Sequence, residues 1–380
     1  MNKLKKLFAI TGSRADYGLL YWTLRRLEGS KKIDLSIIVT GTHLSKDFGH
    51  TINEIKKDKF KIKSKLDINP NSRSELEIAK SIAIAIRKFS SYLKKNKPDA
   101  VLLLGDRYEC FAVATASYIN KIPIIHIHGG ETTQGSFDEA FRHSITKMSH
   151  LHFTTTNSYR KRVIQLGENP KYVFNYGAPG IENIHKAKLI KKNKLEEMLN
   201  FKFAKRNLLV TYHPVTLEKE TETKNFKNLL MAVKKLKNTK VIFTKSNADN
   251  GGKNINVLID KYVLENKENS KSFVSLGQIK YLSLLKIVDG VVGNSSSGII
   301  EAPSLHTGTI NIGDRQLGRV QAKSIINCSD NTIEILKAFK KLFNKNYKKL
   351  LSNTINPYEK KYTSKFITKK IIEFKFNNII

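Results

Sequence analysis

Cysteine is nearly absent from this sequence of 380 residues, which contains only Cys110 and Cys328. The two lie far apart and outside any CxxC or Cys/His spacing, so the sequence predicts neither a disulfide framework nor a structural zinc site. Long apolar runs are also missing, since none approaches the roughly 18 to 20 residues that cross a bilayer. Thr11-Gly12 interrupts the first apolar stretch before a secretory signal forms. We therefore expect a cytoplasmic protein without a membrane partner.

Acidic residues are few: 33 Asp and Glu stand against 67 Lys and Arg, giving a net charge of +34. Such a balance is typical of proteins that bind nucleic acids. The lysines, however, are scattered beside asparagines, whereas a nucleic-acid module more often concentrates arginine and aromatic residues in one block. We expect no specific nucleic-acid partner, and interpret the basic charge as an attraction for an anionic substrate.

Apolar runs of strand length alternate with amphipathic stretches of helix length, a pattern that predicts parallel sheets covered on both faces. Strands are expected at 7–11, 35–40, 101–104 and 124–127, and a second series begins at 207–212. The predicted fold class is α/β, with two Rossmann-like domains at 1–182 and 200–355 and a helical tail at 356–380 that packs back on the first. Because ligands of such sheets bind beyond the carboxyl ends of the strands, polar residues at these ends are the candidate site.

Two candidate turns follow early strands. Thr11 to Gly18 includes Arg14 and Asp16, and it either receives an anion or forms an ordinary strand-to-helix turn. Asp106 and Arg107 follow the apolar run 101–104, where a carboxylate is either a catalytic group or a helix N-cap. The first turn lacks the later glycines of GxGxxG, and GxxxxGK[ST] is absent, so we expect neither a dinucleotide nor a P-loop nucleotide site.

The stretch from His126 to Glu131 places two histidines at alternate strand positions before a Gly-Gly-Glu turn. A polar pocket wall is the preferred interpretation, and a metal site is the alternative that lacks a third ligand. Asp138 with Arg142, and Glu139 with His143, have the (i, i+4) spacing of helical ion pairs, either at the site or on a solvent-facing surface.

The second half has its own candidate residues. His213 precedes a proline that holds it in an extended turn. The stretch 290–301 contains Ser295, Ser296, Ser297 and Glu301 at a strand-to-helix junction, where hydroxyls and main-chain N–H groups suit a phosphate. Arg315 follows the next predicted strand and adds a guanidinium.

As a set, these stretches resemble the hydrolysing UDP-N-acetylglucosamine 2-epimerases, in particular the bacterial enzymes of sialic-acid biosynthesis. The resemblance rests on Thr11 to Gly18, Gly41 to Leu44, Gly105 to Glu109, His126 to Glu131, Arg142 to Lys147, Gln165 to Glu168, His213-Pro214, Gly293 to Glu301 and Gly313 to Arg319. It implies a glycosyltransferase-B-like fold with two domains facing across a cleft. One departure is His128, which stands where many relatives have a glutamate, one of the family's proposed catalytic carboxylates.

The resemblance implies that UDP-N-acetylglucosamine is eliminated to 2-acetamidoglucal and then hydrated, giving UDP and N-acetylmannosamine without a cofactor or metal. The groups implied as catalytic are Asp106, Glu131, Asp138, His43 and His213. The groups implied to bind the UDP-sugar are Arg14, Asp16, Arg107, His128, Arg142, His213, Ser295, Ser296, Ser297, Glu301 and Arg315. A homodimer is the default assembly. The alternatives are the same chemistry on UDP-2,4-diacetamido-2,4,6-trideoxyhexose for legionaminic acid, and a UDP-sugar-dependent glycosyltransferase.

Overall fold

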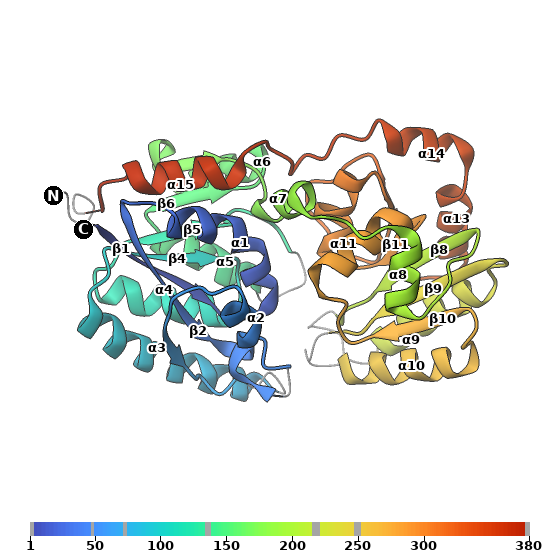
Figure 1. The fold of residues 1–380 in the computed structure, drawn as a ribbon, viewed down its shortest axis with the longest axis horizontal. Coiled ribbons are helices and arrows are strands. Elements are labelled where there is room, and N and C mark those ends of the chain that lie inside the picture. Colours follow the sequence, from blue (N-terminus) through green and yellow to red (C-terminus); the bar gives the residue numbers. More distant parts are fainter. Residues whose placement is uncertain are drawn as a thin grey trace. The chain divides into compact units, whose positions relative to one another are not determined.

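The computed structural model describes residues 4–46, 49–70, 74–133, 138–214, 221–246 and 252–376. The chain divides into two compact units, each with its own sheet (Figure 1). The first unit consists of Met1–Glu131, Phe137–Asn183 and Tyr358–Ile380, and the second of Thr132–Ser136 and Ile184–Pro357. Within the described residues, no helix combines the length and apolar character needed to span a membrane.

The first unit contains seven parallel strands in the order β3-β2-β1-β4-β5-β6-β7. The strands that follow β1 in the sequence, β2 and β3, lie on one side of it, and the strands that follow β4 lie on the other side of the sheet. The strand order therefore reverses between β1 and β4, and ligands of open parallel sheets bind at the carboxyl ends of the strands at such a switch point. The strands are β1 (Lys5–Thr11), β2 (Ile33–Thr40), β3 (Ile62–Leu66), β4 (Ala100–Leu104), β5 (Ile124–Ile127), β6 (Leu151–Thr154) and β7 (Val173–Asn175).

Helices cover both faces of this sheet. Successive residues of a strand point to opposite faces, and in β1 Leu7 packs in one core cluster while Phe8 packs in the other. The helices are α1 (Arg14–Glu28), α2 (Ile52–Lys57), α3 (Glu75–Asn96), α4 (Tyr108–Ile119), α5 (Asp138–Met148), α6 (Asn157–Gln165), α7 (Pro179–Lys186) and α15 (Thr363–Glu373). The last helix, red in Figure 1, contributes Ile367 and Ile371 to the same cluster as Leu7.

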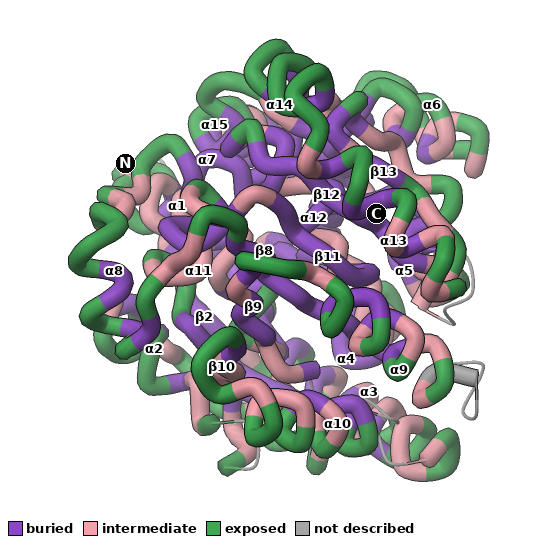
Figure 2. The backbone as a smooth tube through the Cα atoms, turned by 90° about the vertical axis from the view of Figure 1, so that its right-hand side faces the viewer, coloured by how far each residue is buried: buried purple, intermediate pink, exposed green. Residues whose placement is uncertain are grey.

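The second unit contains six parallel strands in the order β10-β9-β8-β11-β12-β13. They are β8 (Arg206–Thr211), β9 (Thr239–Thr244), β10 (Ser270–Phe273), β11 (Gly290–Gly293), β12 (Gly308–Ile312) and β13 (Ile325–Cys328). Every residue of β11 and β12 is buried, as their purple colour shows in Figure 2. The helices are α8 (Lys192–Leu199), α9 (Thr221–Lys234), α10 (Gly252–Glu265), α11 (Gly277–Ile287), α12 (Ser296–Ile300), α13 (Thr332–Leu342) and α14 (Lys345–Ser352).

The predicted α/β class with two Rossmann-like domains is confirmed. The strand expected at 124–127 has the same bounds in the structure, and those at 7–11 and 101–104 begin slightly earlier than expected. At the edge of the second sheet, β10 pairs in register with β9 from Val241 to Thr244.

Candidate active site

An ion-paired cluster lies at the carboxyl end of β4 in the first unit. Asp106 follows that strand, and its carboxylate forms an ion pair with the guanidinium of Arg142 on α5. The Arg142 side chain is 1% exposed, and its Nη1 also donates to Glu139 Oε2 at 2.9 Å and to the main-chain oxygen of Glu131 at 2.8 Å. Burial alone lowers the pKa of this guanidinium, but Asp106, Glu131 and Glu139 outweigh it, so the pKa is raised. Arg142 therefore stays cationic and joins two predicted site residues.

One of the two pairs expected within α5 can be compared with the structure. Arg142 pairs with Glu139, and the predicted Asp138–Arg142 pair stays a prediction. Glu139 is three residues before Arg142 on the same helix face, which gives it the same access to the buried guanidinium. The predicted pair of Glu139 with His143 is confirmed, with Oε1 and Nε2 3.2 Å apart.

The turn after β5 contains a second pair of ionisable residues. His128 Nδ1 lies 2.9 Å from Glu131 Oε1, and both side chains are nearly buried, at 8% and 3% exposure. Thr155, after β6, donates its hydroxyl to the same carboxylate oxygen at 2.9 Å. The other histidine of this stretch, His126, has its Nε2 2.8 Å from the main-chain oxygen of Gly105, and burial lowers its pKa to about 3. His126 is thus a neutral group that ties β5 to the end of β4.

Asp16 and His43 lie at the ends of β1 and β2, where their polar atoms are used within the protein. Asp16 forms a capping box with Ser13, and its carboxylate also accepts from the main-chain N–H groups of Gly12 and Tyr17. His43 is fully buried, and burial lowers its pKa. Its Nε2 is 2.9 Å from Thr11 Oγ1, and its Nδ1 is engaged by a threonine hydroxyl at 2.8 Å. These contacts give both residues a structural role, and their predicted roles toward substrate stay predictions.

Glycine at position 12 brings the ends of β1 and β4 together. A Cβ on Gly12 would stand 2.7 Å from Cγ of Glu109, the buried second residue of α4. Glu109 Oε1 in turn accepts from Arg107 Nε at 2.8 Å. Arg14, two residues after Gly12, is exposed in the first turn of α1. Arg14, Arg107 and Asp106 thus follow neighbouring strands at the switch point of the first sheet.

In the second unit, one asparagine connects the ends of three adjacent strands. Asn294 follows β11 and is 1% exposed. Its side chain accepts from the main-chain N–H of His213 at 2.7 Å and donates to the main-chain oxygen of His213 at 2.7 Å. Its own main-chain oxygen accepts from Arg315 at 3.0 Å and from Gln316 at 2.8 Å, after β12. His213 and Arg315, both predicted site residues, are therefore held next to the serine stretch.

The three serines after Asn294 have different surroundings. Ser295 caps α12, its hydroxyl accepting from the N–H of Ser297. The Ser297 hydroxyl accepts from Tyr281 of α11 at 2.8 Å. Ser296 is left as the serine whose hydroxyl has no hydrogen-bond partner within the described residues. Glu301 ends the short helix, and burial raises its pKa although Ser297 opposes the shift.

Several residues that hydrogen-bond to the predicted site residues were not identified from the sequence. Asn294 lies inside the predicted stretch 290–301, but no nearby sequence feature indicates that its side chain forms two hydrogen bonds with the main chain of His213. Tyr281 and Thr155 come from other elements and have no motif around them. The structural use of Asp16 did have a signal, since Ser13-x-x-Asp16 has the spacing of a capping box. Within the described ranges, no group of three or more His, Cys, Asp or Glu side chains is arranged to hold a metal ion.

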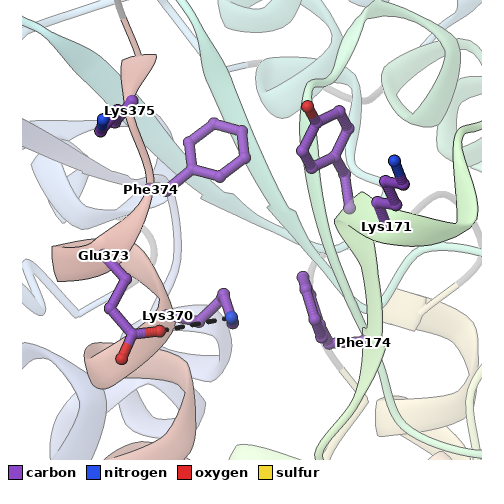
Figure 3. Close-up of a pocket in the computed structure, with 7 residues that line it drawn as sticks. Lys171, Phe174, Lys370, Glu373, Phe374 and Lys375 are labelled. Atoms are coloured by element: carbon purple, nitrogen blue, oxygen red, sulfur yellow. Dashed lines mark ion pairs between the residues drawn. The ribbon is translucent and has the colours of Figure 1, made fainter.

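A hollow of about 320 Å³ lies elsewhere on the first unit (Figure 3). Its lining comes from the residues before and within β7 and from the end of α15, and includes none of the predicted site residues. Tyr172 precedes β7, so the hollow is at the amino end of that strand, whereas the predicted site residues follow strand carboxyl ends. Lys370 pairs with Glu373 there and lies over the ring of Phe174.

Comparison with known proteins places this chain in a family. Residues 25–372 match the family model described as UDP-N-acetylglucosamine 2-epimerase. The chain belongs to the UDP-N-acetylglucosamine 2-epimerase family. It is 42% identical over 344 residues to the GDP/UDP-N,N'-diacetylbacillosamine 2-epimerase (hydrolyzing) of Campylobacter jejuni, covering 90% of this chain and 89% of that one. It is 41% identical over 358 residues to the polysialic acid biosynthesis protein P7 of Escherichia coli, covering 94% and 91%.

Solved structures of this family share the fold. The crystal structure of UDP-GlcNAc 2-epimerase from Neisseria meningitidis bound to UDP-GlcNAc superimposes with a TM-score of 0.82 at 20% identity. The likeness covers 97% of this chain and all of that one. The predicted membership of the hydrolysing UDP-N-acetylglucosamine 2-epimerase family is confirmed, and so is the predicted fold class.

Proposed function

We propose that this protein is a hydrolysing UDP-sugar 2-epimerase that converts UDP-N-acetylglucosamine into UDP and N-acetylmannosamine. The family match supports an epimerase over the glycosyltransferase alternative. The observation that carries the proposal is the gathering of ionisable groups at the carboxyl ends of β4 and β5, with Asp106 held by Arg142 and Glu131 held by His128 and Thr155. A site that only bound a sugar nucleotide would not need so many ionisable groups at strand ends.

The chemistry explains why such groups are needed. No carbonyl adjoins C2 of the sugar, so its proton is not acidic and simple deprotonation cannot invert that carbon. Elimination solves the problem: a base takes the C2 proton, the C2–H electron pair becomes the C1=C2 double bond of 2-acetamidoglucal, and the C1–O bond breaks as UDP departs. Water then adds at C1 while C2 receives a proton on the opposite face. The reaction needs two proton-transferring groups and stabilisation of the departing diphosphate.

The two units suit these two needs. We assign UDP to the second unit, where the Ser296 hydroxyl, the Arg315 guanidinium and the Glu301 carboxyl follow β11 and β12. Ser296 and Arg315 contact phosphate oxygens, and Glu301 accepts from the ribose hydroxyls. We assign the sugar to the first unit, where the Asp106 side chain is 25% exposed beside the fully buried Arg142. The Asp106 carboxylate can therefore contact a ligand while its ion pair with Arg142 fixes its orientation.

The names of two relatives favour a second candidate substrate. The relative from C. jejuni is named as a diacetylbacillosamine 2-epimerase, and the E. coli relative as a polysialic acid biosynthesis protein, at nearly equal identity. UDP-2,4-diacetamido-2,4,6-trideoxyhexose undergoes the same elimination at C1 and C2, because it differs from UDP-N-acetylglucosamine at C4 and C6. The first product would serve sialic-acid biosynthesis and the second legionaminic-acid biosynthesis.

The decisive experiment incubates purified protein with each UDP-sugar alone in D₂O and follows the products by NMR. We expect UDP and a free 2-epimeric sugar that carries deuterium at C2, with activity unchanged by EDTA. The sugar with the larger kcat/KM is the substrate. Product that retains protium at C2, or turnover that requires an added acceptor, would reject the elimination mechanism.

A further inference from the structure

His128 begins the turn that follows β5, and its backbone conformation is unusual. Its φ of 69° lies in the left-handed region, which non-glycine residues seldom adopt. Its main-chain N–H donates to the oxygen of Phe153 at 3.0 Å, on the neighbouring strand β6. Gly130, two residues later, also has positive φ, and a Cβ there would stand 2.5 Å from the oxygen of Tyr159. Backbone strain of this kind collects at functional sites, where the surrounding structure enforces it.

The contact with Glu131 fixes which nitrogen of His128 carries a proton. Glu131 Oε1 lies 2.9 Å from His128 Nδ1 and also accepts from Thr155 at 2.9 Å. An ionised carboxylate only accepts hydrogen bonds, so Nδ1 must be the donor. In the neutral imidazole, Nε2 then has a lone pair available as a base, and in the cation it has a proton to donate.

The Nε2 atom is buried and has no hydrogen-bond partner among the described residues. An unpaired buried polar atom is unfavourable, so a ligand atom is expected to meet it. Three other histidines also have an unpaired buried nitrogen, so this observation alone does not single out His128. His152, for example, is buried and pairs with Glu168 at 3.3 Å, but it lies within β6, whereas His128 follows the carboxyl end of β5. Ligands of parallel sheets bind at that end.

We propose that His128 is the catalytic base that takes the proton from C2, and that Glu131 is its positioning residue. This inference rests on the elimination mechanism proposed above. His128 Nε2 forms the new N–H bond with the C2 proton, the C2–H electron pair forms the C1=C2 bond, and the C1–O pair leaves with UDP. Where many relatives have a glutamate, this chain therefore uses an imidazole for the same proton. The proton that returns to C2 on the opposite face comes from another group.

Charged groups from neighbouring elements lie around the turn that contains His128 and Glu131. Glu131 follows in the turn itself, and Arg142 of α5 donates to the Glu131 main-chain oxygen at 2.8 Å. From α6, Arg162 Nη1 donates to the main-chain oxygen of Gly130 at 2.9 Å. Asp106, after β4, neutralises part of the Arg142 charge. A carboxylate thus contacts the imidazole directly, while the two guanidiniums hold main-chain oxygens of the turn.

The test is the steady-state kinetics of variants at positions 128 and 131. His128→Glu keeps a proton acceptor at this position, so it should retain far more activity than a variant without one. His128→Asn, which tolerates positive φ, should lose about 10²- to 10⁴-fold in kcat with little change in UDP affinity. Glu131→Gln should lower kcat more than it raises KM, because the carboxylate orients the imidazole.

His152→Asn is the matched control, because it removes a comparably buried imidazole that also pairs with a glutamate. It should keep a kcat close to that of wild type, whatever it does to the melting temperature. A kcat of His128→Asn within about threefold of wild type, or an equal loss of kcat in His152→Asn, overturns the assignment. Failure of the wild-type protein to release UDP from any UDP-sugar would instead reject the proposed function, so the two failures are distinguishable.

Discussion

Asp106, at the end of β4, forms an ion pair with the fully buried guanidinium of Arg142 on α5. The same guanidinium holds Glu139 and the main chain of Glu131, so a single side chain connects two strand ends with a helix. Removing one partner of a buried charge is strongly unfavourable, because the remaining charge stays out of water. Structural and catalytic roles of Asp106 must therefore be separated by experiment.

Asp106→Asn should lower kcat by roughly 10²- to 10⁴-fold if the carboxylate transfers a proton or stabilises the oxocarbenium-like transition state. Glu139→Gln is the matched control, because Glu139 pairs with the same guanidinium and has a similar side-chain exposure, 26% against 25%. Both variants should lower the melting temperature, but only Asp106→Asn should lower turnover. Equal loss of kcat in the two variants would make Asp106 a purely structural partner of Arg142. Steady-state kinetics and thermal melting decide between these outcomes.

Neighbouring serines should behave differently when each is replaced by alanine. Ser296→Ala should weaken UDP binding by about 10- to 100-fold, because it removes a hydroxyl assigned to a phosphate. Ser295→Ala removes a helix cap instead, and should cost about 0.5 to 2 kcal/mol of stability with UDP affinity nearly unchanged. Calorimetric titration of UDP and chemical denaturation measure the two effects. The reverse pattern would show that Ser295 holds the nucleotide.

Asn294→Ala should weaken UDP binding without removing any group assigned to the nucleotide. The asparagine holds His213 through two hydrogen bonds of 2.7 Å, and losing them should cost about 1 to 3 kcal/mol. Asn311→Ala provides the comparison, because Asn311 is also buried but donates to Asn327, on β13. That variant should lose stability while keeping UDP affinity. Unaltered UDP affinity in Asn294→Ala would mean that His213 does not contribute to the nucleotide site.

Glu301→Gln should raise stability at neutral pH while weakening UDP binding. Burial raises the pKa of Glu301, so the folded protein holds this proton more tightly than the unfolded chain does. Its stabilising contribution is complete below the ordinary carboxyl pKa and is lost as the pH rises through the raised value. The melting temperature of Glu301→Gln should therefore exceed that of wild type at pH 8, and the difference should shrink toward pH 4. A difference independent of pH would contradict this account.

Strands buried on both faces were predictable because they are uninterrupted apolar runs, as in Ala100–Leu104 and Ile124–Ile127. The edge strand Ile62–Leu66 was not, because two lysines interrupt it and one of its faces is open to solvent. The site residues were found by their place after predicted strands. Their partners were not, since the pairing of Arg142 with Asp106 depends on how α5 packs against the end of β4.

The return of the chain to the first unit has a consequence for synthesis on the ribosome. Residues Tyr358 onward complete the first unit, with Ile367 and Ile371 fully buried and the Tyr358 hydroxyl 2.9 Å from that of Tyr159. Translation delivers this segment only after the residues of the second unit. The first unit must therefore keep an apolar surface uncovered until residues 358–376 emerge, whereas the second unit does not depend on them. A nascent chain stalled before Tyr358 is accordingly a natural client for chaperones that recognise exposed apolar surface.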